Sequence, residues 1–315
     1  MDDSEAAGAA EESATRARRR LPSRRSALIA GASALGVAGF AVGTATNTLP
    51  FGESIQRLLG TASSGPTGQL GATRVERVWS AARGREVDLL IMLPAKSPQK
   101  NLPMSLLLHG LHGSARKAPP TGLQRQLSND VTRRAVPPYG FVAVDGGDNY
   151  WHQVRPGDDP MAMLLEEVPR WLRERGLGGS EGLPFACTGI SMGGFGAFLY
   201  SRRRAERRQP VRAIAAIAPA LMTSWQEMSK RKAFRDAADW ASMDPLKNLT
   251  ATRDIPTGLW CGTEDSFIGG VRRFATEARP LVVHTGHGKH GDAFNRTAVP
   301  GVVGFLGKYV PSSTA

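Results

Sequence analysis

The chain of 315 residues contains only two cysteines, Cys187 and Cys261. A small secreted domain built on a disulfide framework needs more cysteines than this, so that class of protein is excluded. No lipobox cysteine follows directly after the apolar N-terminal stretch, which argues against lipidation, and no internal repeat is present. The sequence therefore predicts a single domain of about 240 residues that follows an N-terminal extension.

Metal-binding and nucleic-acid-binding motifs are also lacking. His284, His287 and His290 lie close together, but metal-binding helices place histidines four residues apart, and this glycine-rich segment offers no such scaffold. We expect no metal and no cofactor. The net charge of the chain is +12, and it is still +11 when residues 1–25 are left out. A basic surface favours contact with anionic cell-surface polymers, lipid headgroups or an anionic substrate, and no motif indicates nucleic-acid binding.

The N-terminal region reads as an export signal. Arg24 and Arg25 precede a modestly apolar stretch from Leu28 to Val42, as in twin-arginine signals, and Gly43-Thr44-Ala45 offers a cleavage site. The alternative is an uncleaved membrane anchor over residues 27–45, but this stretch is only weakly apolar for a membrane-spanning helix. We assign residues 1–45 to the signal or anchor, 46–73 to a flexible linker rich in Gly, Ser and Thr, and expect export.

The most informative motif is Gly189-Ile190-Ser191-Met192-Gly193, which follows the apolar run 184–188. In a G-x-S-x-G nucleophile elbow the serine lies at a strained turn between a strand and a helix, and the flanking glycines avoid clashes of a Cβ with neighbouring backbone. A helical pattern from Phe195 to Arg204 follows, as the elbow requires. Ser191 is the candidate nucleophile.

An acid and a histidine are expected later in the chain, each after a later strand. Asp265 follows the apolar run 258–261 and is our candidate acid, with Glu264 as the competitor. Among the three histidines after residues 281–283, we favour His290 as the base, because it lies deepest in the loop. His287 is the second choice, and His284 lies at the strand end.

These residues predict acyl transfer through an acyl-serine. The histidine accepts the Ser191 proton and the acid orients the ring. The backbone N–H of Met192 is the first expected oxyanion donor. The second is expected from the loop His109 to Ser114, which follows an apolar strand, and Leu111 is the candidate.

With these motifs, the chain from Arg74 to the C-terminus resembles the α/β-hydrolases of the secreted esterase group that also contains the mycolyltransferases. The segments 145–152 and 238–245 add to the resemblance. It implies an α/β-hydrolase fold with the nucleophile, acid and base at Ser191, Asp265 and His290. The mycolyltransferases use glutamate as the acid, so the aspartate at this position favours a general esterase.

The pattern of apolar runs agrees with this fold class: a mostly parallel sheet with helices on both faces, within a catalytic domain over 74–315. Residues 220–249 are long for a connection and predict a small helical cap. Asp158 or Asp159 caps a helix that has Pro160 in its first turn and ends at Gly176. The predicted strands are 74–80, 86–93, 105–108, 141–144, 185–189, 213–217, 258–261 and 281–283.

Cys187 and Cys261 fall on strands that another strand separates in this fold. Second-neighbour strands lie roughly 10 Å apart, beyond the reach of a disulfide at about 7 Å, so both cysteines are expected to be free. Tyr150, Trp151 and Trp240 are candidates for lining an acyl or aryl pocket, with packing in the core of the cap as the alternative.

Three functions stay open from the sequence. The first is an exported serine esterase that acts on a small-molecule or lipid ester. The second is an acyltransferase that moves the acyl group to a sugar or lipid alcohol, because the acyl-enzyme is common to both reactions. The third is a non-catalytic surface-binding module with the same fold. The complete set of serine, acid and histidine argues against this third function, because a binding module does not need it.

Overall fold

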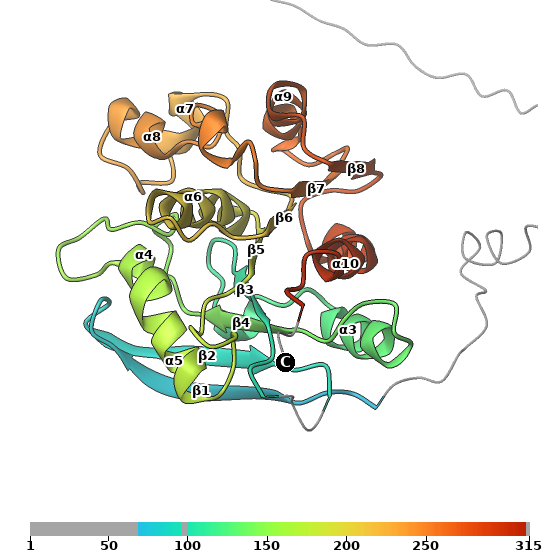
Figure 1. The fold of residues 1–315 in the computed structure, drawn as a ribbon. Helices are drawn as coiled ribbons and strands as arrows, with labels where there is room; N and C mark the ends of the chain where they lie inside the picture. The colour runs from blue at the N-terminus through green and yellow to red at the C-terminus, as the bar shows by residue number, and fades with distance from the viewer. Residues whose placement is uncertain (1–68, 96–99, 313–315) are drawn as a thin grey trace, which may run out of the picture. The chain divides into compact units, whose positions relative to one another are not determined.

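The protein is described by a computed structural model that covers residues 69–95 and 100–312. The expected signal over 1–45 and nearly all of the expected linker over 46–73 lie outside these residues. A mixed sheet of eight strands crosses the described part of the chain (Figure 1), in the spatial order β1-β2-β4-β3-β5-β6-β7-β8.

The strands match the predicted apolar runs to within a few residues. Their bounds are β1 (Thr73–Ser80), β2 (Arg85–Met92), β3 (Met104–Leu108), β4 (Gly140–Val144), β5 (Ala186–Ile190), β6 (Ala213–Ile217), β7 (Thr257–Gly262) and β8 (Val282–Gly286). Only β1 with β2 and β2 with β4 pair antiparallel, and the remaining pairs are parallel. All five residues of β3, β4 and β6 are buried, as expected for parallel strands covered on both faces.

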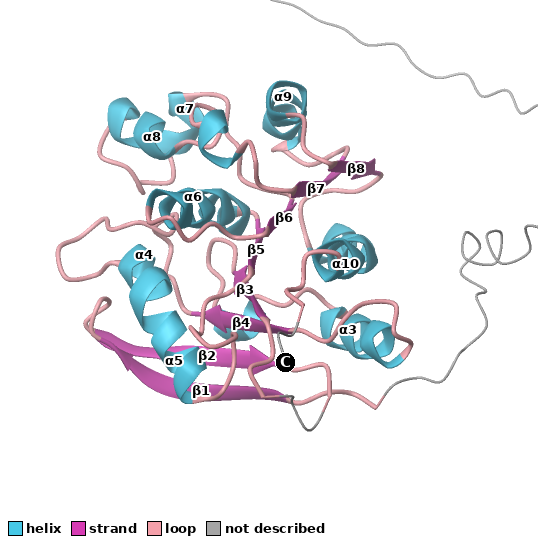
Figure 2. Cartoon of the chain, viewed as in Figure 1, coloured by secondary structure: helices cyan, strands magenta, loops and turns pink. Residues whose placement is uncertain are grey.

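Helices cover both faces of the sheet (Figures 1 and 2). Helices α3 (Leu123–Thr132) and α10 (Asp292–Gly307) lie on one face, and α6 (Met192–Glu206) and α9 (Ile268–Ala278) on the other. The second face also carries α4 (Pro160–Ala162), which continues through a π-helical turn, η2 (Met163–Glu167), into α5 (Val168–Glu174). This arrangement confirms the predicted α/β-hydrolase fold.

The segment expected to form a cap holds two short helices, α7 (Trp225–Ser229) and α8 (Ala237–Met243), which lie beyond α6 in Figure 1. Two short 3-10 helices complete the described elements, η1 (Ala115–Lys117) and η3 (Leu249–Thr252). In the part of the chain that the structure covers, no helix has the length and apolar character needed to cross a membrane.

Local chemistry explains several element ends. Asp159 caps α4, because its carboxylate accepts the N–H groups of Met161 and Ala162 at 2.9 and 3.0 Å, and Pro160 occupies the first turn as predicted. The terminal helix starts at Asp292, so the loop that carries His290 ends one residue after the histidine.

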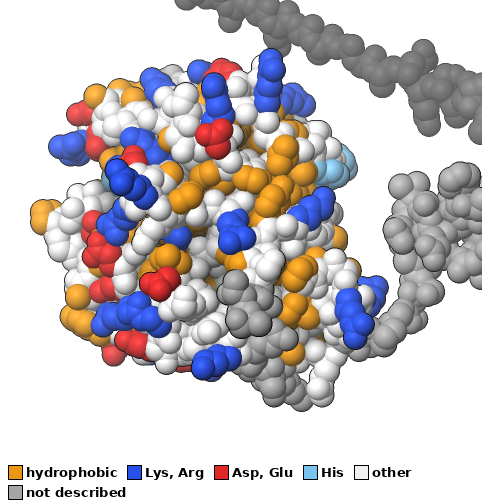
Figure 3. Space-filling view, viewed as in Figure 1, with side chains coloured by type: hydrophobic (Ala, Val, Ile, Leu, Met, Phe, Trp, Pro, Cys, Tyr) orange, Lys and Arg blue, Asp and Glu red, His pale blue; other side chains and the backbone are white. Residues whose placement is uncertain are grey.

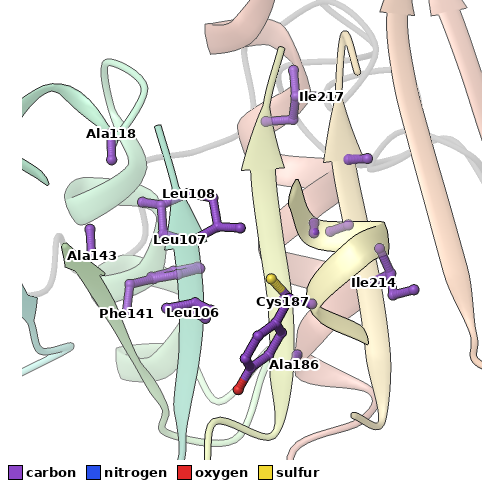
Figure 4. Close-up of a cluster of buried hydrophobic side chains, with 14 of the residues drawn as sticks. Leu106, Leu107, Leu108, Ala118, Phe141, Ala143, Ala186, Cys187, Ile214 and Ile217 are labelled. Atoms are coloured by element: carbon purple, nitrogen blue, oxygen red, sulfur yellow. The ribbon is translucent and has the colours of Figure 1, made fainter. Parts of the chain in front are cut away.

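The core lies between the sheet and its helices, and Figure 4 shows part of it, with Leu106 of β3 beside its register partner Cys187 of β5. Both cysteines are buried and free, as predicted, and β6 lies between their strands. Figure 3 shows Lys and Arg side chains distributed over the visible face, consistent with the basic composition.

Candidate active site

Ser191 lies at the turn between β5 and α6, where its backbone has φ 58° and ψ −118°. A positive φ is costly for a residue with a side chain, and the surrounding structure must hold it. The backbone around this turn approaches so closely that only glycine fits beside it. A Cβ at Gly189 would lie 1.9 Å from the carbonyl oxygen of Gly193, and one at Gly193 would lie 2.0 Å from that of Leu108. The two glycines therefore make the elbow possible.

Three side chains from three loops meet at this turn. The Oγ of Ser191 lies 3.0 Å from Nε2 of His290, and Nδ1 of the same ring lies 2.6 Å from Oδ2 of Asp265. A carboxylate oxygen only accepts hydrogen bonds, so Nδ1 carries the proton and Nε2 is left to accept from the serine hydroxyl. The geometry is that of a nucleophile, a base and an orienting acid.

Asp265 is well placed to hold the imidazole ring. Its side chain is fully buried, and its second oxygen accepts the N–H of Phe267 at 2.8 Å, so the carboxylate cannot rotate without losing a bond. The ring of Phe267 meets the His290 ring edge-on, at a centroid distance of 5.1 Å. The imidazole is thus held from the carboxylate side and from one flank.

The competing residues are not at this site. Glu264 pairs with His287, which is 91% exposed, and its own backbone N–H bonds to Gly288. His284 lies within β8, on an exposed part of that edge strand, because the strand extends to Gly286. Neighbouring residues of a chain point in different directions, which is why one carboxylate faces the serine and the other faces solvent.

The expected oxyanion donors lie beside the serine. Met192 is the first residue of α6, and the leading N–H groups of a helix have no acceptor within it. A Cβ added to Gly110 would lie 3.3 Å from Cβ of Ser191, so the loop after β3 passes directly over the nucleophile. Leu111 lines the same pocket.

His109 fixes the direction of that loop. The backbone N–H of Gly146 donates to its Nε2 at 2.9 Å, so Nδ1 carries the proton and donates to the carbonyl of Gly110 at 2.7 Å. In a trans peptide the carbonyl of one residue and the N–H of the next point in opposite directions. The bond to Gly110 therefore sets where the N–H of Leu111 points.

His109 is suited to this role because it stays neutral. The side chain is buried, and burial lowers its pKa. Its ring packs against Trp151 at 4.8 Å. Sequence reasoning did not identify His109, although its position directly before the glycine of the loop is a signal that could have indicated it.

Two carboxylates tie the rest of the loop to the segment after β4. Asp148 accepts the backbone N–H of His112 at 2.6 Å and its Nδ1 at 2.7 Å, and Asp145 accepts the N–H of Ala115 at 2.7 Å. The acidic residues of segment 145–152 thus hold the loop after β3 in place.

The pocket at Ser191 has a volume of about 330 Å³. The residues that line it are Gly110, Leu111, Tyr150, Ile190, Ser191, Arg231, Ser266, Phe267 and His290. Tyr150 is thus on the pocket wall. Among the described residues, no cluster of three or more His, Cys, Asp or Glu side chains is arranged to hold a metal ion.

Trp151 and Trp240 do not line this pocket, which corrects the expectation for both. Trp151 is fully buried, and a Cβ added to Gly146 or Gly196 would lie 2.3 Å from its indole, so these glycines make room for the ring. Trp240 is 3% exposed and stacks on Trp225 within the cap segment, at a centroid distance of 6.2 Å. Both indoles serve packing.

Comparison with known proteins identifies the family of this chain. Residues 80–270 match a family model described as "Putative esterase", a stretch that includes Ser191 and Asp265 and ends before His290. No curated protein matches the sequence.

Solved structures show the same fold at low sequence identity. A ferulic acid esterase superposes with a TM-score of 0.62 and 16% identity, over 76% of this chain and 98% of its own. An S-formylglutathione hydrolase from Agrobacterium tumefaciens gives 0.60 and 17%, over 79% and 98%. MPT51 (FbpC1) from Mycobacterium tuberculosis gives 0.57 and 14%, over 76% and 99%.

Proposed function

Because the chain belongs to the esterase family of α/β-hydrolases that its residues 80–270 match, we propose that it hydrolyses carboxylic esters with Ser191 as nucleophile, His290 as base and Asp265 as acid. The observation that carries this proposal is the continuous line of hydrogen bonds from Asp265 through His290 to Ser191, at 2.6 and 3.0 Å.

In the acylation step, His290 accepts the hydroxyl proton through Nε2 while Oγ of Ser191 attacks the carbonyl carbon of the ester. The N–H groups of Met192 and Leu111 stabilise the negative charge that develops on the carbonyl oxygen. The bond between the acyl carbon and the alcohol oxygen then breaks, and His290 returns the proton to the leaving alcohol. The acyl group remains on Ser191.

In the deacylation step the same groups act on water. His290 accepts a proton from a water molecule, whose oxygen attacks the acyl carbon, and the tetrahedral intermediate again places its oxyanion on the two backbone N–H groups. The bond to Oγ breaks, and Ser191 regains its proton from His290. Asp265 stabilises the imidazolium in both steps without becoming protonated.

The test is hydrolysis of 4-nitrophenyl acetate, butyrate and octanoate by the full-length chain and by Ser191→Ala. The wild type is expected to release nitrophenol with an initial burst, and the variant to lose at least about a thousandfold in kcat. Ser242→Ala is the matched control, because this serine is exposed on α8 and its hydroxyl donates to the carbonyl of Asp239, outside the pocket lining. Equal turnover by the wild type and Ser191→Ala would refute the assignment.

We also propose that the protein is exported by a twin-arginine route. The support is the sequence pattern alone, Arg24 and Arg25 before the apolar stretch 28–42, which lies outside the described residues. Replacement of both arginines by lysine keeps the charge and is expected to retain the protein inside the producing cell. Fractionation and immunoblotting measure this, and unchanged export of the double variant would rule out the route.

A further inference from the structure

Arg231 brings a positive charge into the wall of the Ser191 pocket. Among the described residues that line this pocket, it is the one whose side chain carries a permanent positive charge. Two nearby cations of the cap have acidic partners: Lys230 pairs with Glu227, and Arg235 with Asp239. Within the described part of the chain, the guanidinium of Arg231 has neither an ion pair nor a hydrogen bond.

The backbone around Arg231 is firmly attached. Its N–H donates to the carbonyl of Met228 at 2.9 Å. Two residues later, the carbonyl of Ala233 accepts from Nε2 of His152 at 2.7 Å, and Phe234 stacks on the same imidazole at 4.6 Å. The position of Arg231 beside the pocket is thus set by the core and by the segment that carries Tyr150.

Tyr150 supplies a second donor in the same pocket. The residue is 1% exposed, and its ring packs on Phe195 and Phe234 at 5.2 and 5.7 Å. Its hydroxyl has no hydrogen-bond partner among the described residues and is not one of their fully buried unpaired polar atoms, so it opens onto the pocket and can donate to a bound ligand. Burial raises the pKa of Tyr150 to about 12 against the opposing charge of Arg231, so the hydroxyl keeps its proton and can donate.

A neighbouring cleft of about 290 Å³ extends the positive region. The two clefts are lined by consecutive residues of the chain: Asn149 and Lys232 line the second cleft, and Tyr150 and Arg231 line the first. The cations that line the second cleft are Arg83, Arg85, Arg155 and Lys232. Its two carboxylates already have partners: Asp158 pairs with both Arg83 and Arg85, and Asp148 bonds to His112. The surplus of positive charge attracts anions to this side of the site.

We propose that the Tyr150 hydroxyl and the Arg231 guanidinium form an anion-binding subsite in the Ser191 pocket, and that the preferred substrates are esters that carry a carboxylate besides the scissile ester. A guanidinium binds a carboxylate through two parallel N–H groups, and a protonated hydroxyl adds a third donor. This inference rests on the proposed esterase function and names its substrate class.

The experiment compares matched pairs of esters with the full-length chain. On the acyl side, mono-4-nitrophenyl glutarate carries a carboxylate, and the corresponding amide, 4-nitrophenyl glutaramate, is its neutral match. On the alcohol side, 4-acetoxybenzoate is compared with 4-acetoxybenzamide. The readout is the ratio of kcat/KM for the anionic ester to that for its neutral match, which cancels general effects on the catalytic groups.

The wild type is expected to prefer the anionic member of at least one pair by about fivefold or more, the effect of one partly exposed charge pair. The preference is expected to fall as salt is added. Arg231→Gln lowers the ratio to near one, Arg231→Glu inverts it, and Tyr150→Phe lowers it in part while keeping the packed ring. Lys230→Gln, the matched control one residue away, leaves the ratio unchanged.

The outcomes separate the two proposals. Turnover of the neutral esters with a ratio near one in both pairs overturns the subsite and leaves the esterase function standing. A preference that Arg231→Gln does not change also overturns the subsite. Absence of turnover with every ester contradicts the esterase function itself.

Discussion

Replacement of Asp265 by asparagine tests the proposed acid with almost no change in shape. One carboxylate oxygen accepts the N–H of Phe267 at 2.8 Å, and the other accepts from Nδ1 of His290 at 2.6 Å. In the variant the amide oxygen stays on the Phe267 N–H, so the NH₂ group faces the imidazole. Nδ1 must then accept, which leaves the proton on Nε2, and His290 can no longer accept the proton of Ser191.

The expected loss is large because the side chain is fully buried. Both the tautomer and the stabilisation of the imidazolium are lost, and in serine proteases such a change costs about 10⁴-fold in kcat, or roughly 5.5 kcal/mol of transition-state stabilisation. We expect about 10³-fold to 10⁴-fold here, measured as kcat for 4-nitrophenyl butyrate at pH 7.

Glu264→Gln is the matched control, one residue away. Its carboxylate pairs with the exposed His287 at the surface, so we expect less than about a twofold change in kcat. Thermal unfolding of both variants checks that each is folded. The reasoning is refuted if Glu264→Gln loses more activity than Asp265→Asn, or if Asp265→Asn retains more than about a tenth of the wild-type kcat.

Two further changes test the surroundings of the site. His109→Leu removes the hydrogen bond that orients the Leu111 N–H. We expect kcat to fall about tenfold to a hundredfold, with a much smaller change in KM. An equal change in kcat and KM would contradict a positioning role for His109. Burial raises the pKa of Asp244 from its ordinary 3.8 to about 6, so folding takes up a proton between these values, and this group lowers the free energy of unfolding by about 2 kcal/mol as the pH rises from 4 to 6. Asp244→Asn is expected to remove this dependence in chemical denaturation, and an unchanged slope with pH would show that another group is responsible.

The sequence predicted the parts of the site that depend on local backbone geometry. The glycines around Ser191 indicate the elbow because the close approach they permit occurs within a few residues. The strand positions could be predicted as well, because each apolar run is a local feature of the sequence. The order of the strands, with β3 between β4 and β5, could not be predicted from any local pattern, because it depends on pairing between distant segments.

Which of two adjacent side chains faces the pocket was harder to predict. Tyr150 and Trp151 both have positive φ, at 52° and 64°, so the chain turns sharply between pocket and core. A sequence pattern does not reveal such a turn, and the two aromatic residues were therefore treated alike. Arg231 gave no signal at all, because a cap residue reaches the pocket only through the tertiary packing of Phe234 and His152.

The most direct test of the central claim is to locate the nucleophile chemically. The full-length chain is treated with a fluorophosphonate, and the adduct is mapped by mass spectrometry of the intact protein and its peptides. A single adduct on the peptide that contains Ser191, absent from Ser191→Ala and formed much more slowly in His290→Ala, is the predicted result. No adduct on the folded wild type, or an adduct that persists in Ser191→Ala, would contradict the account.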